Sequence, residues 1–386
     1  MSAPFAQTPI IVLTGFLGAG KSTLLRKLLD HPDFERCGIV INEFGDIAID
    51  HELVTAGSPQ VSVTTTGCLC CTAGSDVRAS IAELHAEAQK LGRLPLDRVI
   101  VETTGLADLA PVVNQLVAGA VPAFGLRDHT VARHYRLAGI VTVFDAVEGP
   151  GTLERHAECV KQVALADRIL LTKTDLIAPE ERSARRAEIA GTLAGVNRNA
   201  TVSDVLSESF DLAAAFAPQT FAPRDIDGDV EDWLGGGLHA GHHGHEHHHH
   251  HHDEHQDHSH HDHGGAGHHD GRDETGSFGI GTVSIALDDP LSKDALAHVL
   301  DLVDMLHGPH LLRLKGLIVF ADEPQTPYVL QVVQHVVHPL LRLEAWPSED
   351  RRTRLVAITH GIDPRSVERM LSAVVAAGRA EPVPLG

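Results

Sequence analysis

The sequence lacks several features that would place a chain in a membrane or outside the cell. No run approaches the roughly eighteen apolar residues that a membrane-spanning helix needs. The first residues, MSAPFAQTPIIVLTG, have no basic segment ahead of the first apolar run, so they do not resemble a secretory signal. Only five cysteines are present, and three of them lie too close together to form a disulfide framework. We therefore expect a soluble cytoplasmic protein that does not bind membranes.

Basic residues are also scarce. The chain has 31 Lys and Arg against 52 Asp and Glu, a formal net charge of −21. Because nucleic-acid phosphates would be repelled over most of such a surface, nucleic acid is not an expected partner. Much of the negative charge lies between Asp225 and Glu274, alongside 17 of the 29 histidines. That segment is therefore either a linker or a tract that binds metal ions.

The apolar pattern divides the chain into three parts. Residues 8–215 alternate short apolar runs with helical patterns, which predicts βαβ units and a mostly parallel sheet. Residues 216–278 are dominated by Gly, His, Asp and Glu without apolar periodicity, which predicts a disordered His-rich linker. Residues 279–380 predict a smaller α+β domain, with strands GTVSIAL, LLRLKGLIVF, YVLQVVQHVV and RLVAITH and helices over 289–307 and 364–377.

A phosphate-binding loop follows the first predicted strand. The segment GFLGAGKS fits the pattern G-x-x-x-x-G-K-[ST] and lies between the apolar run IIVLT and the helical pattern STLLRKLL, so the first domain is predicted to be a P-loop NTPase. Glycines let backbone N–H groups converge on phosphate, where Lys21 can reach the β- and γ-phosphates. The predicted nucleotide contacts are Gly15, Phe16, Leu17, Gly18, Ala19, Gly20, Lys21, Ser22 and Thr23.

The segment LLTKTD, at the end of a later apolar run, indicates how the base is bound. It stands where GTPases carry N-K-x-D, so Asp175 can accept hydrogen bonds from guanine N1 and N2 while the stem of Lys173 packs on the ring. Thr172 replaces the Asn and offers one hydroxyl in place of an amide. GTP is therefore favoured over ATP, and strict selectivity for guanine stays open.

Two further strand ends carry acidic residues. The segment VIVETTG ends with Glu102 and Gly105. A carboxylate there can hold Mg²⁺ or orient the attacking water, and the glycine leaves room for the γ-phosphate. The segment INEFGD follows the second strand as a switch-like loop whose Glu43 can face the nucleotide or a metal. We predict Lys21 and Glu102 as catalytic residues, Ser22 and Glu102 as Mg²⁺ ligands and Glu43 as a further candidate.

Three cysteines within four positions, in the segment TTTGCLCC, predict a metal site. Thiolates are soft ligands that suit Zn²⁺ or Co²⁺. Cys68 and Cys70 share one face of an extended strand, and a turn at Cys71 brings in the third thiolate. By contrast, Cys37 and Cys159 stand alone, and we expect both to be small buried residues.

The segments GFLGAGKSTLL, INEFGD, GCLCC, ETTG and TKTD, in that order, resemble the P-loop GTPases of the CobW family, the zinc and cobalt metallochaperones. The segments LLRLKGLIVF and VVQHVVH are similar to the small C-terminal domain of that family. The resemblance implies a GTPase that transfers the metal bound at Cys68, Cys70 and Cys71 to a client metalloprotein, and it allows a GTP-dependent homodimer. It also leaves open a cobalt-handling role in cobalamin synthesis or in activating an enzyme such as nitrile hydratase.

The histidine tract HHGHEHHHHHHDEHQDHSHHDHGG is internal and interleaved with acidic residues and glycine, unlike a purification tag. A flexible string of imidazoles binds several ions with little selectivity. Its predicted low-specificity ligands are His247, His248, His249, His250, His251 and His252. His335 alternates along an apolar strand, which favours a packed histidine. Two other functions stay open at this point: a passive metal-storage protein and a P-loop kinase for a small molecule.

Overall fold

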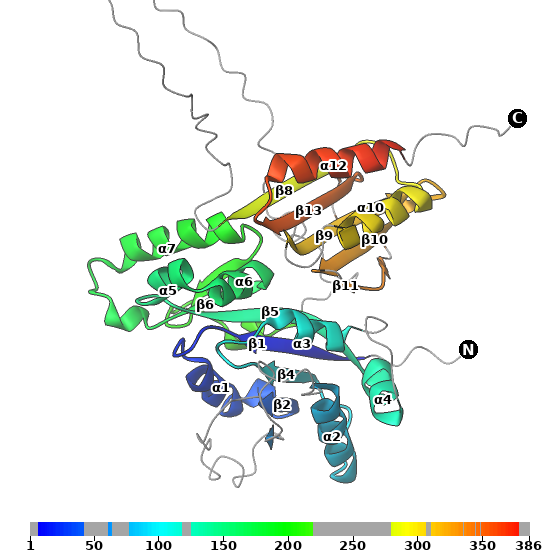
Figure 1. The fold of residues 1–386 in the computed structure, drawn as a ribbon. Helices are drawn as coiled ribbons and strands as arrows, with labels where there is room; N and C mark the ends of the chain where they lie inside the picture. Colours follow the sequence, from blue (N-terminus) through cyan, green and yellow to red (C-terminus); the bar gives the residue numbers. More distant parts are fainter. Residues whose placement is uncertain are drawn as a thin grey trace, which may run out of the picture.

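The computed structural model describes residues 7–41, 61–63, 77–117, 125–218, 279–305, 310–334, 336–343, 345–347 and 349–377. These residues form two β-sheets with helices packed against them, one built from the N-terminal half of the chain and one from the C-terminal part (Figure 1). Within the ranges given, none of the helices is long and apolar enough to cross a bilayer.

The first sheet has seven strands in the order β3-β2-β4-β1-β5-β6-β7, and every neighbouring pair is parallel. This confirms the predicted α/β fold with a parallel sheet. The strands are β1 (Thr8–Thr14), β2 (Cys37–Ile41), β3 (Val61–Val63), β4 (Arg98–Glu102), β5 (Tyr135–Asp145), β6 (Arg168–Thr172) and β7 (Thr201–Asp204). The helices are α1 (Lys21–Leu29), α2 (Val77–Lys90), α3 (Leu109–Leu116), α4 (Leu126–His134), α5 (Gly149–Arg155), α6 (Ala157–Leu165), α7 (Arg182–Val196) and α8 (Leu212–Ala215).

Helices cover both faces of this sheet, which explains why its strands are apolar on both sides. In β1, Ile10 and Val12 pack in one cluster with α2 and α3, whereas Ile11 and Leu13 pack in another with α1 and α8. Side chains alternate between the two faces of a strand, so a strand covered on both sides must be apolar at consecutive positions. The continuous run IIVL is therefore what a central strand of this fold requires.

The second sheet is antiparallel, as an α+β domain requires. Its main order is β11-β10-β9-β13-β8, and β12 pairs with β10. The elements are β8 (Ile280–Leu287), α10 (Lys293–Met305), β9 (Leu311–Phe320), β10 (Glu323–Val333), β11 (Val336–Val337), β12 (Leu341–Arg342), β13 (Thr353–His360) and α12 (Pro364–Ala377). Both helices pack on one face of this sheet, where their apolar residues share a core with β8, β9 and β13.

Two details of the predicted second domain were wrong. The segment YVLQVVQHVV is not one strand, because Gln334 has a φ of 53° and the chain turns there, so β11 pairs antiparallel with the end of β10. The helix expected from Asp289 begins only at Lys293. Pro290 disfavours a helical conformation in the residue before it, and Leu291 instead forms a bridge with Phe320. His335 lies outside the described residues.

The two sheets meet through helix α6. On its apolar face, Cys159, Val160 and Val163 share a core cluster with Ile280, Leu312 and Ile358 of the second sheet. Figure 1 shows α6 beside the strands of the second sheet. A polar contact adds to this packing, because the guanidinium of Arg313 donates to the backbone oxygen of Leu165 at the C-terminus of α6.

Candidate functional site

Polar loops gather at one edge of the first sheet. In a parallel sheet all strands end at the same edge, and ligands of such folds bind outside the carboxyl ends of the strands. The loop GFLGAGKS follows β1, the segment ETTG follows β4, and TKTD follows β6. Register places Leu13 of β1 opposite Glu102 of β4, so the first two loops leave the sheet side by side.

The loop after β1 has the geometry of a phosphate-binding loop. Gly15 has a φ of 144°, and a Cβ there would come within 2.3 Å of the Val143 oxygen, so only glycine fits. Gly20 has a φ of 98° and precedes the first turn of α1. The buried side chain of Lys21 turns back into the loop, where Nζ donates to Gly15 O at 2.7 Å and to Phe16 O at 3.2 Å. The loop therefore holds its cation at the helix N-terminus, where an anion binds.

The other residues predicted in this loop differ in exposure. Leu17 is 59 % exposed, Ser22 and Thr23 are exposed in the first turn of α1, and Ala19 is buried. The ring of Phe16 packs against His156, with ring centroids 4.6 Å apart. The side chains of Ser22 and Thr23 are thus open to solvent at the start of α1, while Phe16 packs the loop against His156 at the start of α6.

The segment ETTG lies directly against this loop. Glu102 is 3 % exposed at the end of β4. The hydroxyl of Thr103 donates to the Thr14 hydroxyl at 2.9 Å. A Cβ on Gly105 would come within 2.5 Å of the Leu17 backbone nitrogen, so the two loops approach as closely as a glycine permits. The carboxylate of Glu102 is therefore placed next to the phosphate loop by β-sheet register and by glycine packing.

Thr172 contacts the phosphate loop itself. Its hydroxyl donates to Ala19 O at 2.7 Å and lies 3.3 Å from Phe144 O. A Cβ on Gly20 would lie 3.6 Å from its methyl carbon. Because the hydroxyl has one proton and the Ala19 contact is the shorter, the main role of Thr172 in this structure is to fasten TKTD to the phosphate loop.

Lys173 and Asp175 lie in the turn after β6. Lys173 has a left-handed backbone with φ 58°, and its Nζ pairs with Asp145 Oδ2 at 2.6 Å. Asp175 is exposed, and its backbone oxygen accepts from Arg182 at 3.1 Å. The Thr174 hydroxyl donates to Asp204 at 2.9 Å, which fixes this turn against the end of β7. The turn thus presents a lysine stem and a carboxylate at the edge where a base would lie.

The residues present fit Mg²⁺. Ser22 and Glu102 supply a hydroxyl and a carboxylate, the hard oxygen donors that Mg²⁺ takes, and each stands next to the phosphate loop. Among the residues that the structure describes, no group of three or more His, Cys, Asp or Glu side chains could hold a metal ion.

The predicted thiolate site lies outside the described residues, as do Glu43 and the histidines 247–252. The two remaining cysteines are described and are buried, as the sequence predicted. Desolvation raises the pKa of each thiol, Cys37 and Cys159, to about 12. Neither belongs to a cluster of three or more His, Cys, Asp or Glu among the described residues.

Sequence reasoning missed three residues that shape the site. Asp145 ends β5 and holds both Lys173 and the backbone of the next turn, through Val147 N at 2.8 Å. Gln162 of α6 donates to Gly105 O at 3.1 Å. Asp204 at the end of β7 accepts from Thr174 and pairs with Arg186. Asp145 could have been predicted from the sequence, because in the segment AGIVTVFDA an apolar run is followed by a carboxylate, as in the segment that ends at Glu102.

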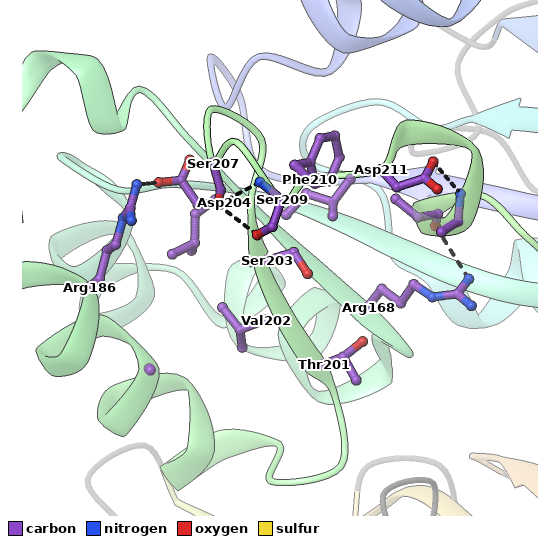
Figure 2. Close-up of a pocket in the computed structure, with 15 residues that line it drawn as sticks. Arg168, Arg186, Thr201, Val202, Ser203, Asp204, Ser207, Ser209, Phe210 and Asp211 are labelled. Atoms are coloured by element: carbon purple, nitrogen blue, oxygen red, sulfur yellow. Dashed lines mark hydrogen bonds and ion pairs between the residues drawn. The ribbon is translucent and has the colours of Figure 1, made fainter. Parts of the chain in front are cut away.

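A cavity of about 620 Å³ lies elsewhere, along the edge strand β7. Figure 2 shows Val202 and Ser203 of β7 among its lining residues, with Arg186 on one side and Arg168 on the other. The charged groups on its walls are engaged: Arg186 pairs with Asp204, and Arg168 donates to Ala217 O at 2.7 Å. No residue of the phosphate loop lines it, so this cavity is separate from the candidate nucleotide site.

Known proteins show the same two parts. The family model described as "CobW/HypB/UreG, nucleotide-binding domain" matches residues 9–203, and the model of the "Cobalamin synthesis protein cobW C-terminal domain" matches residues 280–375. The zinc chaperone YjiA of Escherichia coli is 32% identical over 212 residues, which cover 55% of this chain and 62% of YjiA. The match thus spans less than two-thirds of that relative. The zinc chaperone CobW of a Sinorhizobium species is 29% identical, with 96% of this chain and 98% of the relative covered.

The fold is likewise shared with a solved structure. The crystal structure of the Zn(II)-bound YjiA GTPase from E. coli matches with a TM-score of 0.63 at 21% identity, covering 96% of this chain and 99% of that one. At this identity the likeness shows the fold alone, with a parallel-sheet nucleotide domain followed by an antiparallel-sheet domain. The first family model covers half of the chain, and the chain therefore belongs to the CobW/HypB/UreG family, with a CobW-type C-terminal domain.

Proposed function

We propose that the protein is a GTP-hydrolysing metallochaperone that binds Zn²⁺ at Cys68, Cys70 and Cys71 and delivers it to a client metalloprotein. The observation that supports this most is the place where the thiol segment leaves the sheet. Val63 at the end of β3 pairs in register with Ile41, which in turn pairs with Glu102. The segment that carries the three cysteines therefore starts at the same edge as the nucleotide loops.

The chain's own residues supply most of what GTP hydrolysis needs. Lys21 and the backbone N–H groups of the loop compensate charge on the phosphates, and Lys173 and Asp175 hold the base. Glu102, buried next to the phosphate loop, orients the attacking water or holds the metal. Mg²⁺ bound at Ser22 and Glu102 would neutralise charge on the β- and γ-phosphate oxygens. Without a partner residue that adds charge compensation, we expect slow turnover.

Zinc is the proposed cargo because three clustered thiolates suit it and because the relatives named above are called zinc chaperones. Cobalt is the alternative, since soft sulfur ligands bind both ions and affinity order alone does not decide which one a cell loads. The trio must stay reduced to bind either ion, so the proposal places the protein in a reducing compartment such as the cytoplasm.

Delivery requires contact with a client, and the edge that carries the nucleotide loops suits one. Four leucines are 45 % or more exposed, each in the segment that directly follows a strand of the first sheet: Leu17, Leu106, Leu176 and Leu206. Exposed apolar side chains gathered around a site mark surfaces for protein contact. We propose that the client metalloprotein docks here, where the state of the nucleotide can alter the surface. The same surface would serve a GTP-dependent homodimer.

The test is a zinc and cobalt titration with GTP, with GDP and without nucleotide, repeated on Cys68→Ser, Cys70→Ser and Cys71→Ser. Cobalt–thiolate absorption reports sulfur ligation directly. Binding free energies are reciprocal, so GTP must raise metal affinity by the factor by which metal raises GTP affinity, about 5–150-fold for an ordinary coupling. Equal metal affinity in all three nucleotide states would favour passive storage. Lys21→Ala tests hydrolysis separately: it should abolish phosphate release, with circular dichroism showing that the chain still folds.

A further inference from the structure

Helix α6 carries a buried amide that faces the ETTG loop. Gln162 is 1 % exposed and lies among the apolar residues of the helix. Its Nε2 donates to Gly105 O at 3.1 Å and lies 3.5 Å from Ala107 O. Both neighbours are carbonyl oxygens, which fixes the orientation of the amide, because Oε1 could not face them. In the part of the chain that the structure describes, Oε1 has no hydrogen-bond partner.

Such a residue is costly if its role is only to fill space. A buried polar group is unfavourable unless its donors and acceptors are satisfied, and half of this amide is not. An apolar side chain of the same size would remove the orphaned acceptor. An apolar side chain could not hold the Gly105 carbonyl, so the hydrogen bond from Nε2 is what a glutamine adds at this position.

Gly105 is held from two sides. Gln162 binds its oxygen from α6, and the backbone of Leu17 in the phosphate loop packs where its side chain would be. Gln162 is itself fixed by its place within helix α6, and the Thr142 hydroxyl of β5 also donates to its backbone oxygen at 2.9 Å. In a trans peptide the C=O and the following N–H point in opposite directions. Holding Gly105 O on α6 therefore turns the N–H of Leu106 away from α6.

We propose that Gln162 is a positioning residue for GTP. Its hydrogen bond keeps the Gly105 carbonyl oxygen turned away from the γ-phosphate, so that the N–H side of the ETTG loop stays available to that phosphate. This inference rests on the proposed function. A carbonyl oxygen aimed at the γ-phosphate would be repelled, whereas an N–H is attracted. GDP lacks the γ-phosphate, so the orientation of this peptide affects GTP binding and hardly affects GDP binding.

The test compares the affinities of the full-length protein for a non-hydrolysable GTP analogue and for GDP. Gln162→Met keeps the size of the side chain and removes the donor, so the preference for the GTP analogue should fall about two- to tenfold, the effect of one hydrogen bond. Thr142→Val is the matched control, because it removes the bond to the backbone of the same residue and leaves Nε2 in place. It should lower the melting temperature without changing the preference.

A second variant keeps the test decisive if Gln162→Met folds poorly. In Gln162→Glu, burial raises the pKa of the new carboxyl, which can donate to Gly105 O only when protonated. Relative to wild type at each pH, its GTP preference should be low at pH 8 and recover at pH 5.5. The melting temperature, measured at each pH, separates the two roles: a merely structural role would restore the melting temperature and GDP binding together with GTP binding, leaving the preference unchanged.

The outcomes separate the two proposals. Wild-type protein that binds no GTP analogue would overturn the proposed function. Wild-type protein that binds and hydrolyses GTP, together with an unchanged preference in Gln162→Met and no recovery in Gln162→Glu, would overturn the role of Gln162 alone.

Discussion

A buried charge cluster joins the two sheets, and breaking it should destabilise the protein strongly. Asp167, 5 % exposed just before β6, accepts from Arg313 at 2.5 Å and from Lys315 at 2.8 Å, both on β9. Its second oxygen accepts from Ile140 N at 2.8 Å. Burial by itself raises the pKa of the Asp167 carboxyl, but Arg313 and Lys315 outweigh burial and hold that pKa well below its usual range. The carboxylate is therefore ionised, and the cluster depends on its charge.

Asp167→Asn should lower the free energy of unfolding by about 3–5 kcal/mol, because it leaves two cations buried without their carboxylate. Glu188→Gln is the matched control: it makes the same change in an ion pair with Arg185 in which Glu188 is 62% exposed. That loss should stay below about 1 kcal/mol. Adding Arg313→Met and Lys315→Met to Asp167→Asn should recover most of the stability, since none of the three side chains of this cluster is then charged.

The assay is chemical denaturation at pH 7, followed by circular dichroism. The pKa of Asp167 is lower in the folded state than in the unfolded state. Its contribution to the free energy of unfolding is therefore fully present above the unfolded pKa of about 3.9, and it is lost as the pH falls toward the folded pKa. The difference between wild type and Asp167→Asn should accordingly shrink in acid. A loss no larger than that of Glu188→Gln would show that the cluster does not hold the sheets together.

Three further predictions follow from other contacts. Asp145→Asn removes the partner of the Lys173 ammonium, so KM for GTP should rise about two- to tenfold in a phosphate-release assay while the melting temperature changes little. Burial and the neighbouring Arg313 lower the pKa of Lys315 to about 8. Above pH 8 the folded state therefore binds fewer protons than the unfolded state. The free energy of unfolding of wild type should accordingly rise relative to that of Lys315→Met between pH 8 and 10. Deleting residues 238–269 should lower the number of zinc ions bound per chain in a dye-competition titration, yet leave GTP hydrolysis and one tight site intact; loss of the tight site would move the principal metal chemistry to the histidines.

The loops of the candidate nucleotide site could be placed at one edge of the sheet from sequence, because each is a local pattern. GFLGAGKS, ETTG and TKTD each follow an apolar run, and parallel strands bring their carboxyl ends to one edge without any further information. The exact role of Thr172 could not be found in this way. Its hydroxyl binds Ala19 O, 153 positions away, and no local pattern shows which of two neighbouring loops a strand-end hydroxyl will face.

Long-range polar contacts set a similar limit elsewhere. Asp167 and Arg313 are 146 positions apart, and in sequence each is only a charged residue beside an apolar run. The turn at Gln334 was missed for a different reason: the residues around it are uniformly β-forming, and no Gly, Asn or Pro marks the positive φ.

Helix α6 shows why the site is more than its loops. Near its start, His156 packs on Phe16 of the phosphate loop; in its last turn Gln162 holds Gly105, and at its end Leu165 O accepts from Arg313 of the second sheet. Asn197, just after α7, donates to the backbone oxygens of the last turn of α6, including Ala164 O at 3.0 Å, which ties that end of the helix to α7. The helix is thus in contact with both of these loops and with the second sheet. In sequence this helix, AECVKQVAL, is an ordinary amphipathic segment, and only the fold makes it the common support of both loops and both sheets.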